Sequence, residues 1–358
     1  MFREVMQMSN ISRFAAVNTK IKTLESEFLL SKHYRNLLEQ KSVADAARYL
    51  KSETAYKDVL ENIDVNQLRR ATLESITKQK MLINIDKIIH YFNGDYKRFI
   101  KTLNAKYEIA ELKAVARAVF NGMDTKPFRN SVFIGKYSKV DEERVYNAKY
   151  IRDIIEAFEG TAFYKYMQPL LDNNIKENLF RFEMVLDASY YEILQKEWKK
   201  LDKHDVEVLE KAQGIMADLL NLQWIYRGIK FFSLSPEELL NYTIHLGYRL
   251  DKNFIKQLCY SKGLEEFYEL ASQTKYKFLF KNDETTDIFM ERRLERHMYF
   301  ELKAVERDNP MTIITTFAYI IFMDIEVRDI TSIIEMIRYG MPEAEAEKYL
   351  IRALNGGE

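Results

Sequence analysis

The stretch DLLNLQWIYRGIKFFSLSPEELL, residues 218–240, has the pattern of one helix, a break and the start of a second helix. Its apolar residues recur at a helical spacing of three, four and three: Leu222, Ile225, Ile229 and Phe232. After the break, Ser235 is a suitable N-cap, Pro236 suits the first helical position, and Glu238 completes a capping box. The stretch therefore predicts a buried helix followed by a second helix that begins at Pro236.

Two other stretches show the same features in the same order. An apolar triple, a glycine and a proline occur upstream at Leu112, Val115, Val119, Gly122 and Pro127, and downstream at Val327, Ile330, Ile334, Gly340 and Pro342. If the three stretches are anchored at Glu111, Asn221 and Glu326, the anchors are 110 and 105 residues apart. The three prolines then follow their anchors by 16, 15 and 16 residues.

Two further signals recur with a similar period. A threonine followed two residues later by a large aromatic residue occurs at Thr54, Thr161 and Thr274, spaced by 107 and 113 residues. Each is followed by a leucine–acid pair: Leu73-Glu74, Leu186-Asp187 and Leu294-Glu295. Self-similarity at a fixed period indicates a repeat architecture. We therefore predict three helical lobes, residues 1–125, 126–240 and 241–358, arranged around a pseudo-three-fold axis with a central hollow.

The composition predicts an all-α fold. Only 11 Gly and 5 Pro occur in 358 residues, so long segments lack the residues that end helices. No run alternates apolar and polar residues between turn signals, which predicts almost no strand. The net charge is zero, which argues against nucleic acid as the main partner. The single Cys259 and the absence of a signal-like N-terminus favour a reducing cytosol.

Several stretches resemble the C subunit of archaeal and bacterial A-type and V-type ATPases, which is similar to the d subunit of eukaryotic vacuolar ATPases. They are FAAVNTKIKTLESEFLLS (14–31), SVADAARYLKSETAYKDVL (42–60), FEMVLDASYY (182–191), LLNLQWIYRGIKFF (219–232) and EVRDITSIIEMIRYGMP (326–342). The resemblance covers essentially the whole chain in the same order. It implies a funnel-shaped, three-lobed protein of the central stalk, without a nucleotide site of its own.

The resemblance also implies the partners and the location. The partners are the central shaft subunits and the proteolipid ring of the membrane sector, and the chain is peripheral on the cytoplasmic face of the membrane. Its role would be to couple rotation of the shaft to the ring. We expect no nucleic acid, no small-molecule substrate, no cofactor and no metal.

The residues give little support to catalysis. No Gly-rich phosphate loop occurs, and the five histidines and the lone cysteine show no zinc-binding spacing. Two carboxylate pairs lie four residues apart on predicted helices: Glu183 with Asp187, and Glu291 with Glu295. Such pairs are compatible with acid–base chemistry, but the arginines 292, 293 and 296 beside the second pair favour a salt-bridged surface. The aromatic pair Phe231-Phe232 is more simply explained as core or lobe packing.

Candidate partner-binding residues follow from the repeat. The polar position directly after the first apolar residue of each triple is occupied by Lys113, Gln223 and Arg328. If the three lobes are equivalent, these side chains point into one hollow; ordinary exposed polar residues on three helices are the alternative. At the level of function, the alternatives to a rotor protein are a general helical scaffold or adaptor and a hydrolase that uses the carboxylate pairs.

Overall fold

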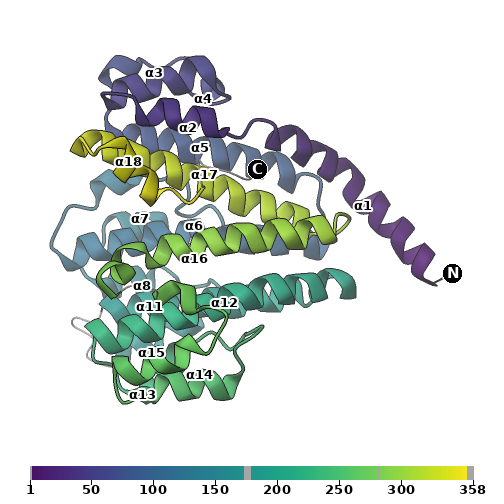
Figure 1. Cartoon of the computed structure of the whole chain (residues 1–358), viewed down its shortest axis with the longest axis vertical. Helices are drawn as coiled ribbons and strands as arrows, with labels where there is room; N and C mark the ends of the chain where they lie inside the picture. The colour runs from purple at the N-terminus through teal and green to yellow at the C-terminus, as the bar shows by residue number, and fades with distance from the viewer. Residues whose placement is uncertain (1, 173–178, 281–282, 353–358) are drawn as a thin grey trace. The chain divides into compact units, whose positions relative to one another are not determined.

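The computed structural model describes residues 2–172, 179–280 and 283–352, and within these ranges it contains helices and no β-strand (Figure 1). The all-α prediction is confirmed. Helices reach 29 residues in α12, because so few glycines and prolines interrupt the chain.

The chain divides into two compact units, and each is described by itself. Unit 1 combines the two ends of the chain, Met1–Tyr91 and Tyr268–Glu358, and unit 2 is the continuous segment Phe92–Phe267. Helix α15 (Leu264–Ser272) crosses the division. These boundaries differ from those of the three predicted lobes, and the lobes, their axis and the funnel remain predictions.

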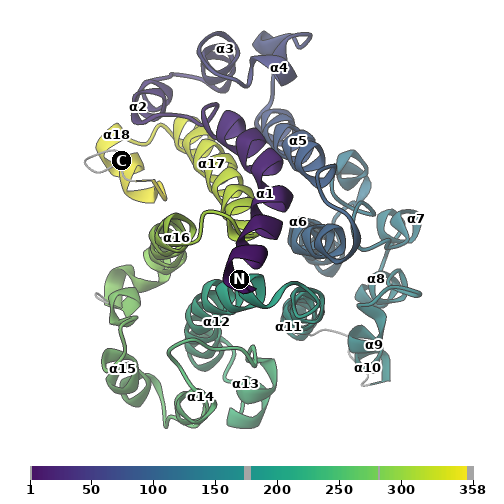
Figure 2. The same cartoon turned by 90° about the vertical axis from the view of Figure 1, so that its right-hand side faces the viewer.

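In unit 1 the long helices α1, α5 and α17 lie side by side (Figure 2). The helices of this unit are α1 (Phe2–Glu25), α2 (Ser31–Leu38), α3 (Val43–Glu53), α4 (Lys57–Leu60), η1 (Val65–Gln67), α5 (Arg70–Ile89), η3 (Lys277–Phe280), α16 (Asp283–Asp308), α17 (Ile314–Tyr339), α18 (Glu343–Ala346) and η4 (Glu347–Tyr349). Helix α17 is buried on all sides over residues 314–327, and its first ten residues, up to Met323, contain no charged side chain, as expected of a helix inside a core.

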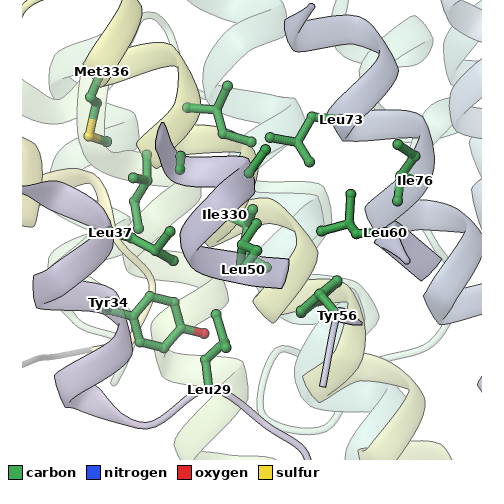
Figure 3. Close-up of a cluster of buried hydrophobic side chains, with 14 of the residues drawn as sticks. Leu29, Tyr34, Leu37, Leu50, Tyr56, Leu60, Leu73, Ile76, Ile330 and Met336 are labelled. Atoms are coloured by element: carbon green, nitrogen blue, oxygen red, sulfur yellow. The ribbon is translucent and has the colours of Figure 1, made fainter. Parts of the chain in front are cut away.

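One apolar cluster joins the two ends of the chain in unit 1 (Figure 3). Leu50 of α3 and Tyr56 before α4 meet Ile330 of α17, and each is at most 1% exposed. The cluster extends to Leu350 near the C-terminus. Truncation of such a residue, for example Leu50→Ala, costs about 2–5 kcal/mol of unfolding free energy.

In unit 2 the long helices α6 and α11 pack against each other (Figure 2). The helices of this unit are α6 (Gly94–Phe120), η2 (Lys126–Asn130), α7 (Glu142–Tyr146), α8 (Ile151–Glu156), α9 (Tyr164–Met167), α10 (Pro169–Asp172), α11 (Leu179–Trp198), α12 (Lys203–Phe231), α13 (Pro236–Tyr242) and α14 (Lys252–Cys259). Trp198 at the end of α11 is fully buried, so this end of the helix is anchored in the core.

The predicted break in the 218–240 stretch is confirmed. Helix α12 ends at Phe231, and Ser235 caps α13 by accepting a hydrogen bond from the Glu238 backbone N–H while the Glu238 side chain accepts one from the Ser235 N–H. Gly340 adopts a left-handed conformation (φ 63°) after α17, which a residue with a Cβ adopts less easily. Pro342 is the N-cap of α18 rather than its first residue.

Two observed boundaries complete the description of the long helices. Helix α6 runs unbroken from Gly94 to Phe120. After α18 the helical part of the chain ends at Tyr349, and Leu350 is extended.

The three threonine signals adopt the same local structure. In each, the threonine hydroxyl oxygen accepts a hydrogen bond from the backbone N–H two residues later, and that residue has a buried aromatic side chain. The pairs are Thr54 with Tyr56 (3.2 Å), Thr161 with Phe163 (3.2 Å), and Thr274 with Tyr276 (3.1 Å). At all three places the turn lies in the connection between one helix and the next.

A buried carboxylate on each of three long helices binds backbone N–H groups of a later loop. Glu108 of α6 accepts from residues 135, 137 and 138. Asp218 of α12 accepts from residues 248–250, and Asp329 of α17 from residues 351 and 352. In a helix or sheet, backbone carbonyls would accept hydrogen bonds from these N–H groups. In these loops the buried carboxylates accept them instead and so fix the path of the loop.

Candidate partner-binding surface

Lys113, the first predicted partner-binding residue, is engaged within unit 2. It lies on α6, and its Nζ contacts both carboxylate oxygens of Asp187 on α11 at 2.8 Å. The two side chains are only 19% and 22% exposed. Burial raises the pKa of Asp187, and the charge of Lys113 opposes that shift. This pair joins two packed helices.

Gln223, the second predicted residue, is buried. It lies on α12 and is 5% exposed. This burial leaves little of its side-chain amide for a partner to contact.

Arg328, the third predicted residue, is the most accessible of the three. It lies on α17 with 46% of its side chain exposed, and it forms an ion pair with Glu295 of α16. Asp324 at 3.3 Å and Glu291 at 3.9 Å are also close to the guanidinium. Arg328 thus sits among three carboxylates of its own unit.

The three residues therefore differ in burial and in their partners. Lys113 and Gln223 belong to unit 2, whereas Arg328 belongs to unit 1. Their convergence on one hollow stays a prediction.

The carboxylate pairs are bound by basic residues. Arg117 of α6 donates two hydrogen bonds to Glu183, at 2.7 and 2.9 Å, while Asp187 is paired with Lys113. Glu291 and Glu295 face Arg328. Among the residues that the structure describes, no three His, Cys, Asp or Glu side chains form a group able to hold a metal ion. The arrangement is that of ion pairs between packed helices.

The arginines beside Glu291 and Glu295 have a role that the sequence did not indicate. They bind backbone carbonyls instead of the neighbouring carboxylates: Arg292 donates to Leu350, Arg296 to Leu350 and Ile351, and Arg293 to Leu279. Burial, together with the positive charges of its neighbours, lowers the pKa of Arg292 to about 10. Arg292 and Arg296 fix the path of the chain after η4, and Arg293 binds η3.

Large apolar side chains are exposed at the ends of three long helices. The residues are Phe120 (46% exposed) and Met123 (65%) at the end of α6, Phe231 (54%) and Phe232 (46%) at the end of α12, and Tyr339 (71%) at the end of α17. Phe231 and Phe232 are therefore not core residues, which was one of the two predicted explanations. Phe232 does pack on a neighbouring helix, because it stacks on Phe180 of α11 with the ring centroids 4.0 Å apart. Contiguous exposed apolar patches are typical of surfaces that bind other proteins, whereas single exposed apolar side chains are common on any surface. Phe231 and Phe232, which are adjacent in sequence, are therefore the candidates to test.

A family model described as "ATP synthase (C/AC39) subunit" matches residues 17–349. The chain belongs to the ATP synthase C/AC39 subunit family. The family resemblance inferred from the sequence is confirmed.

Relatives of this C/AC39 subunit are similar over most of their length. The C subunit of the A-type ATP synthase of Methanocaldococcus jannaschii is 23% identical over 335 residues, which cover 91% of this chain and 83% of that protein. The C subunit from Methanosarcina mazei is 21% identical, covering 95% and 93%, and that from Thermococcus kodakarensis is 23% identical, covering 92% and 88%.

Family membership makes the chain an accessory subunit of an A/V-type ATPase, not an enzyme in its own right. Its partners are therefore other subunits of the complex. In the described part of this C/AC39 subunit, no helix is both long and apolar enough to cross a membrane.

Proposed function

We propose that this C/AC39 subunit is a central-stalk rotor subunit that couples the rotating shaft of the catalytic head to the proteolipid ring of the membrane sector. Coupling of this kind serves ion transport or ATP synthesis by the whole complex. The observation that carries the proposal is the family match over residues 17–349, with relatives named as C subunits of A-type ATP synthases.

The build of each unit suits a part that transmits force. Long helices are joined by ion pairs and buried polar contacts: Lys113 with Asp187 in unit 2, and Asn84 of α5 with Tyr319 of α17 in unit 1. Such contacts resist sliding of one helix along another, because a displaced partner leaves a buried group unpaired.

The predicted three lobes around a hollow belong to the same proposal. The recurrent threonine turns support an internal repeat. In that arrangement Lys113, Gln223 and Arg328 lie on the helices around the hollow that receives the shaft, and Arg328 is the most exposed of the three side chains. The subunit then lies at the cytoplasmic face of the membrane, where its surface meets the loops of the ring.

The exposed helix ends offer the best side chains for a test. We expect the double variant Phe231→Ser/Phe232→Ser to bind its partner subunit about tenfold or more weakly, with little change in unfolding free energy because both side chains are half exposed. Tyr150→Ser is a matched control: Tyr150 is 72% exposed in the same unit but lies at the start of the short helix α8.

The measurement is binding of the purified full-length chain to shaft subunits and to the proteolipid ring from the same source, by biolayer interferometry. Binding of the unsubstituted chain to both is the expected result. If the chain binds neither the shaft subunits nor the proteolipid ring, the rotor proposal is overturned and a general helical scaffold is favoured. Equal binding by the double variant and the Tyr150 control would remove Phe231 and Phe232 from the interface.

A further inference from the structure

A cavity of about 320 Å³ lies in unit 1, beside the link between α1 and α2. Side chains of α16 and α17 and Arg352 form the rest of its wall. Leu30 and Phe300 belong to this wall and are each 49% exposed, so the cavity reaches the surface of the unit. A small molecule or a side chain of another protein can therefore enter it.

Two buried donors on the wall have no acceptor among the described residues. They are the hydroxyl of Tyr34 on α2, a residue that is 1% exposed, and the Nε of Arg352. Burial raises the pKa of Tyr34 well above its ordinary value, and the charge of Arg352 opposes that shift, so the two side chains lie close together. A buried donor without an acceptor is unfavourable. A ligand that supplies an acceptor at this place would remove that cost.

Arg352 is a fixed part of the wall. Its Nη1 donates a hydrogen bond of 2.9 Å to the Leu29 carbonyl. Its central carbon lies 5.2 Å from the ring centroid of Phe28 and 5.6 Å from that of Tyr299. These contacts use Nη1 and the faces of the guanidinium but leave the Nε–H, whose direction they fix. A ligand would therefore meet a preformed donor.

The charges on the wall favour an anion. Lys22 contacts both carboxylates of the wall, with its Nζ 2.7 Å from Glu25 and 3.4 Å from Glu306. Lys303, the second lysine of the wall, lies over the ring of Tyr299 with its Nζ 4.7 Å from the centroid. The two lysines and the guanidinium thus stand against two carboxylates that are already paired.

Two carboxylates behind the wall are satisfied within the fold. Glu326 accepts hydrogen bonds from a backbone N–H and a tyrosine hydroxyl, and Asp329 accepts them from two backbone N–H groups. Both interact with the charge of Arg352. Lys80 lies near Glu326 and Arg296 near Asp329, and each offsets the charge of its neighbour. The exposed ammonium of the second lysine is therefore the surplus charge at the cavity.

The remaining wall is apolar and would contact an apolar part of the ligand. Aromatic rings contribute most of this surface: Phe28, Tyr299, Phe300 and Phe322. A carboxylate accepts hydrogen bonds from several donors at once, and such bonds are stronger than those to a neutral acceptor. A molecule with a carboxylate and an apolar body thus matches both parts of the wall.

We propose that this cavity binds an organic carboxylate, which accepts hydrogen bonds from the Tyr34 hydroxyl and the Arg352 Nε–H beside the Lys303 ammonium. The same chemistry is available in a free small molecule and in an acidic side chain of another protein. The site is independent of the rotor proposal, since it rests on contacts within unit 1.

Titration of the full-length chain with phenylacetate tests the site. This compound combines one ring with one carboxylate, and we expect a Kd in the millimolar range, typical of so small a ligand. The Tyr34 and Tyr299 ring signals should shift in NMR spectra of protein labelled at tyrosine. Phenylacetamide has nearly the same shape without the charge, so it should bind at least about tenfold more weakly.

Tyr34→Phe removes one of the two free donors and keeps the ring. It should weaken phenylacetate binding about tenfold without lowering Tm, because the lost hydroxyl has no hydrogen-bond partner among the described residues. Tyr319→Phe is the matched control. The Tyr319 hydroxyl is also in unit 1 but accepts a hydrogen bond of 3.2 Å from Asn84 and does not line the cavity. Its loss should lower Tm and leave the Kd unchanged.

Lys303→Gln is a second variant that does not depend on the core, because Lys303 is exposed. It should weaken the binding of phenylacetate but not that of phenylacetamide. If Tyr34→Phe does not fold, this variant decides. Equal Kd values for the two compounds, or an unchanged Kd in the variants that fold, would overturn the proposal. Unchanged ring signals at a phenylacetate concentration about tenfold above the expected Kd would do the same.

A peptide probe identifies the source of the carboxylate. N-acetyl-Glu-Phe amide carries its carboxylate on a side chain beside an aromatic ring. Tighter binding of this peptide than of phenylacetate would assign the site to an acidic segment of another protein. Weaker binding would assign it to a free carboxylate, and binding of neither compound would overturn the proposal.

Discussion

The carboxylate of Asp329 on α17 accepts a hydrogen bond of 2.7 Å from the backbone N–H of Ile351. It also accepts one of 3.1 Å from Arg352. Burial nevertheless raises the pKa of this carboxyl from 3.8 to about 6, because the hydrogen bonds compensate only part of the cost of burying the charge. One carboxylate thus fixes the segment that carries Arg352.

Replacement of Asp329 by asparagine should change how stability depends on pH. The folded state binds the Asp329 proton more tightly than the unfolded state, so this stabilisation is fully present below about pH 4 and is lost as the pH rises through about 6. The unfolding free energy of the unsubstituted chain, relative to Asp329→Asn, should fall by about 3 kcal/mol between about pH 4 and pH 8. Urea denaturation at the two pH values measures this difference.

Asp45→Asn is a control of opposite sign. Hydrogen bonds from Ser42 and Arg48 lower the pKa of Asp45, so its contribution is present above about pH 4 and is lost in acid. The same pH trend in both variants would contradict the assignment to Asp329.

Glu108 should determine the structure of the loop after η2. Its carboxylate accepts hydrogen bonds from the backbone N–H groups of Gly135 (2.6 Å), Tyr137 (3.1 Å) and Ser138 (2.7 Å). Glu108→Ala leaves these donors without an acceptor and should cost about 3 kcal/mol. Hydrogen exchange of residues 135–138 should then become faster while exchange in α12 changes little.

Glu108→Gln separates hydrogen bonding from charge. The amide keeps one acceptor oxygen, so roughly half of the loss should remain. Unchanged exchange in the loop of the alanine variant would show that these hydrogen bonds do not hold it.

Removal of the hydroxyl at each of the three threonine turns, which lie far apart in the sequence, should lower the unfolding free energy by a similar amount. Thr54→Val, Thr161→Val and Thr274→Val each remove the acceptor of one turn and should each cost about 1 kcal/mol. The matching serine variants keep the hydroxyl and should lose less. Chemical denaturation of the six variants provides the comparison, and a large loss at one site with none at the others would argue against equivalent turns.

Lys113→Ala should destabilise the chain as well as affect binding. Without Lys113, the Asp187 carboxylate, which is only 22% exposed, loses its ion-pair partner, which should cost about 1–2 kcal/mol. Arg117 joins the same two helices through Glu183, but it is 54% exposed. Arg117→Ala should therefore lower the unfolding free energy by less than about 1 kcal/mol. If Lys113→Ala has the same unfolding free energy as the unsubstituted chain, the pair with Asp187 does not stabilise the fold, and a role of Lys113 in partner binding is favoured.

A helix boundary was predictable from the sequence where all the residues that determine it lie within a few positions of one another. The capping box of Ser235 and the left-handed Gly340 are decided by their own neighbours. The end of the last helix is not decided by its own neighbours, because the path of the chain at Leu350 depends on arginines of α16 and on Asp329 of α17. Such contacts join residues that are far apart in the sequence.

The candidate site was predictable only in part, for the same reason. Spacing placed Lys113 and Arg328 on long helices, as observed. It could not show that Asp187 and Glu295 of other helices would bind them. Phe231 and Phe232 lie in an apolar helical pattern, so only their position at a helix end distinguishes them from core residues.

Unit 1 is built from the two ends of the chain, which has a consequence during synthesis on the ribosome. Leu50 and Tyr56 need Ile330 to complete their cluster, yet all of unit 2 is translated in between. At about 5–20 residues per second, the 274 residues from Tyr56 to Ile330 take about 14–55 s to synthesise. During that time the apolar faces of α2 and α3 are exposed, so a nascent chain of this protein should depend on chaperones mainly through its first 90 residues.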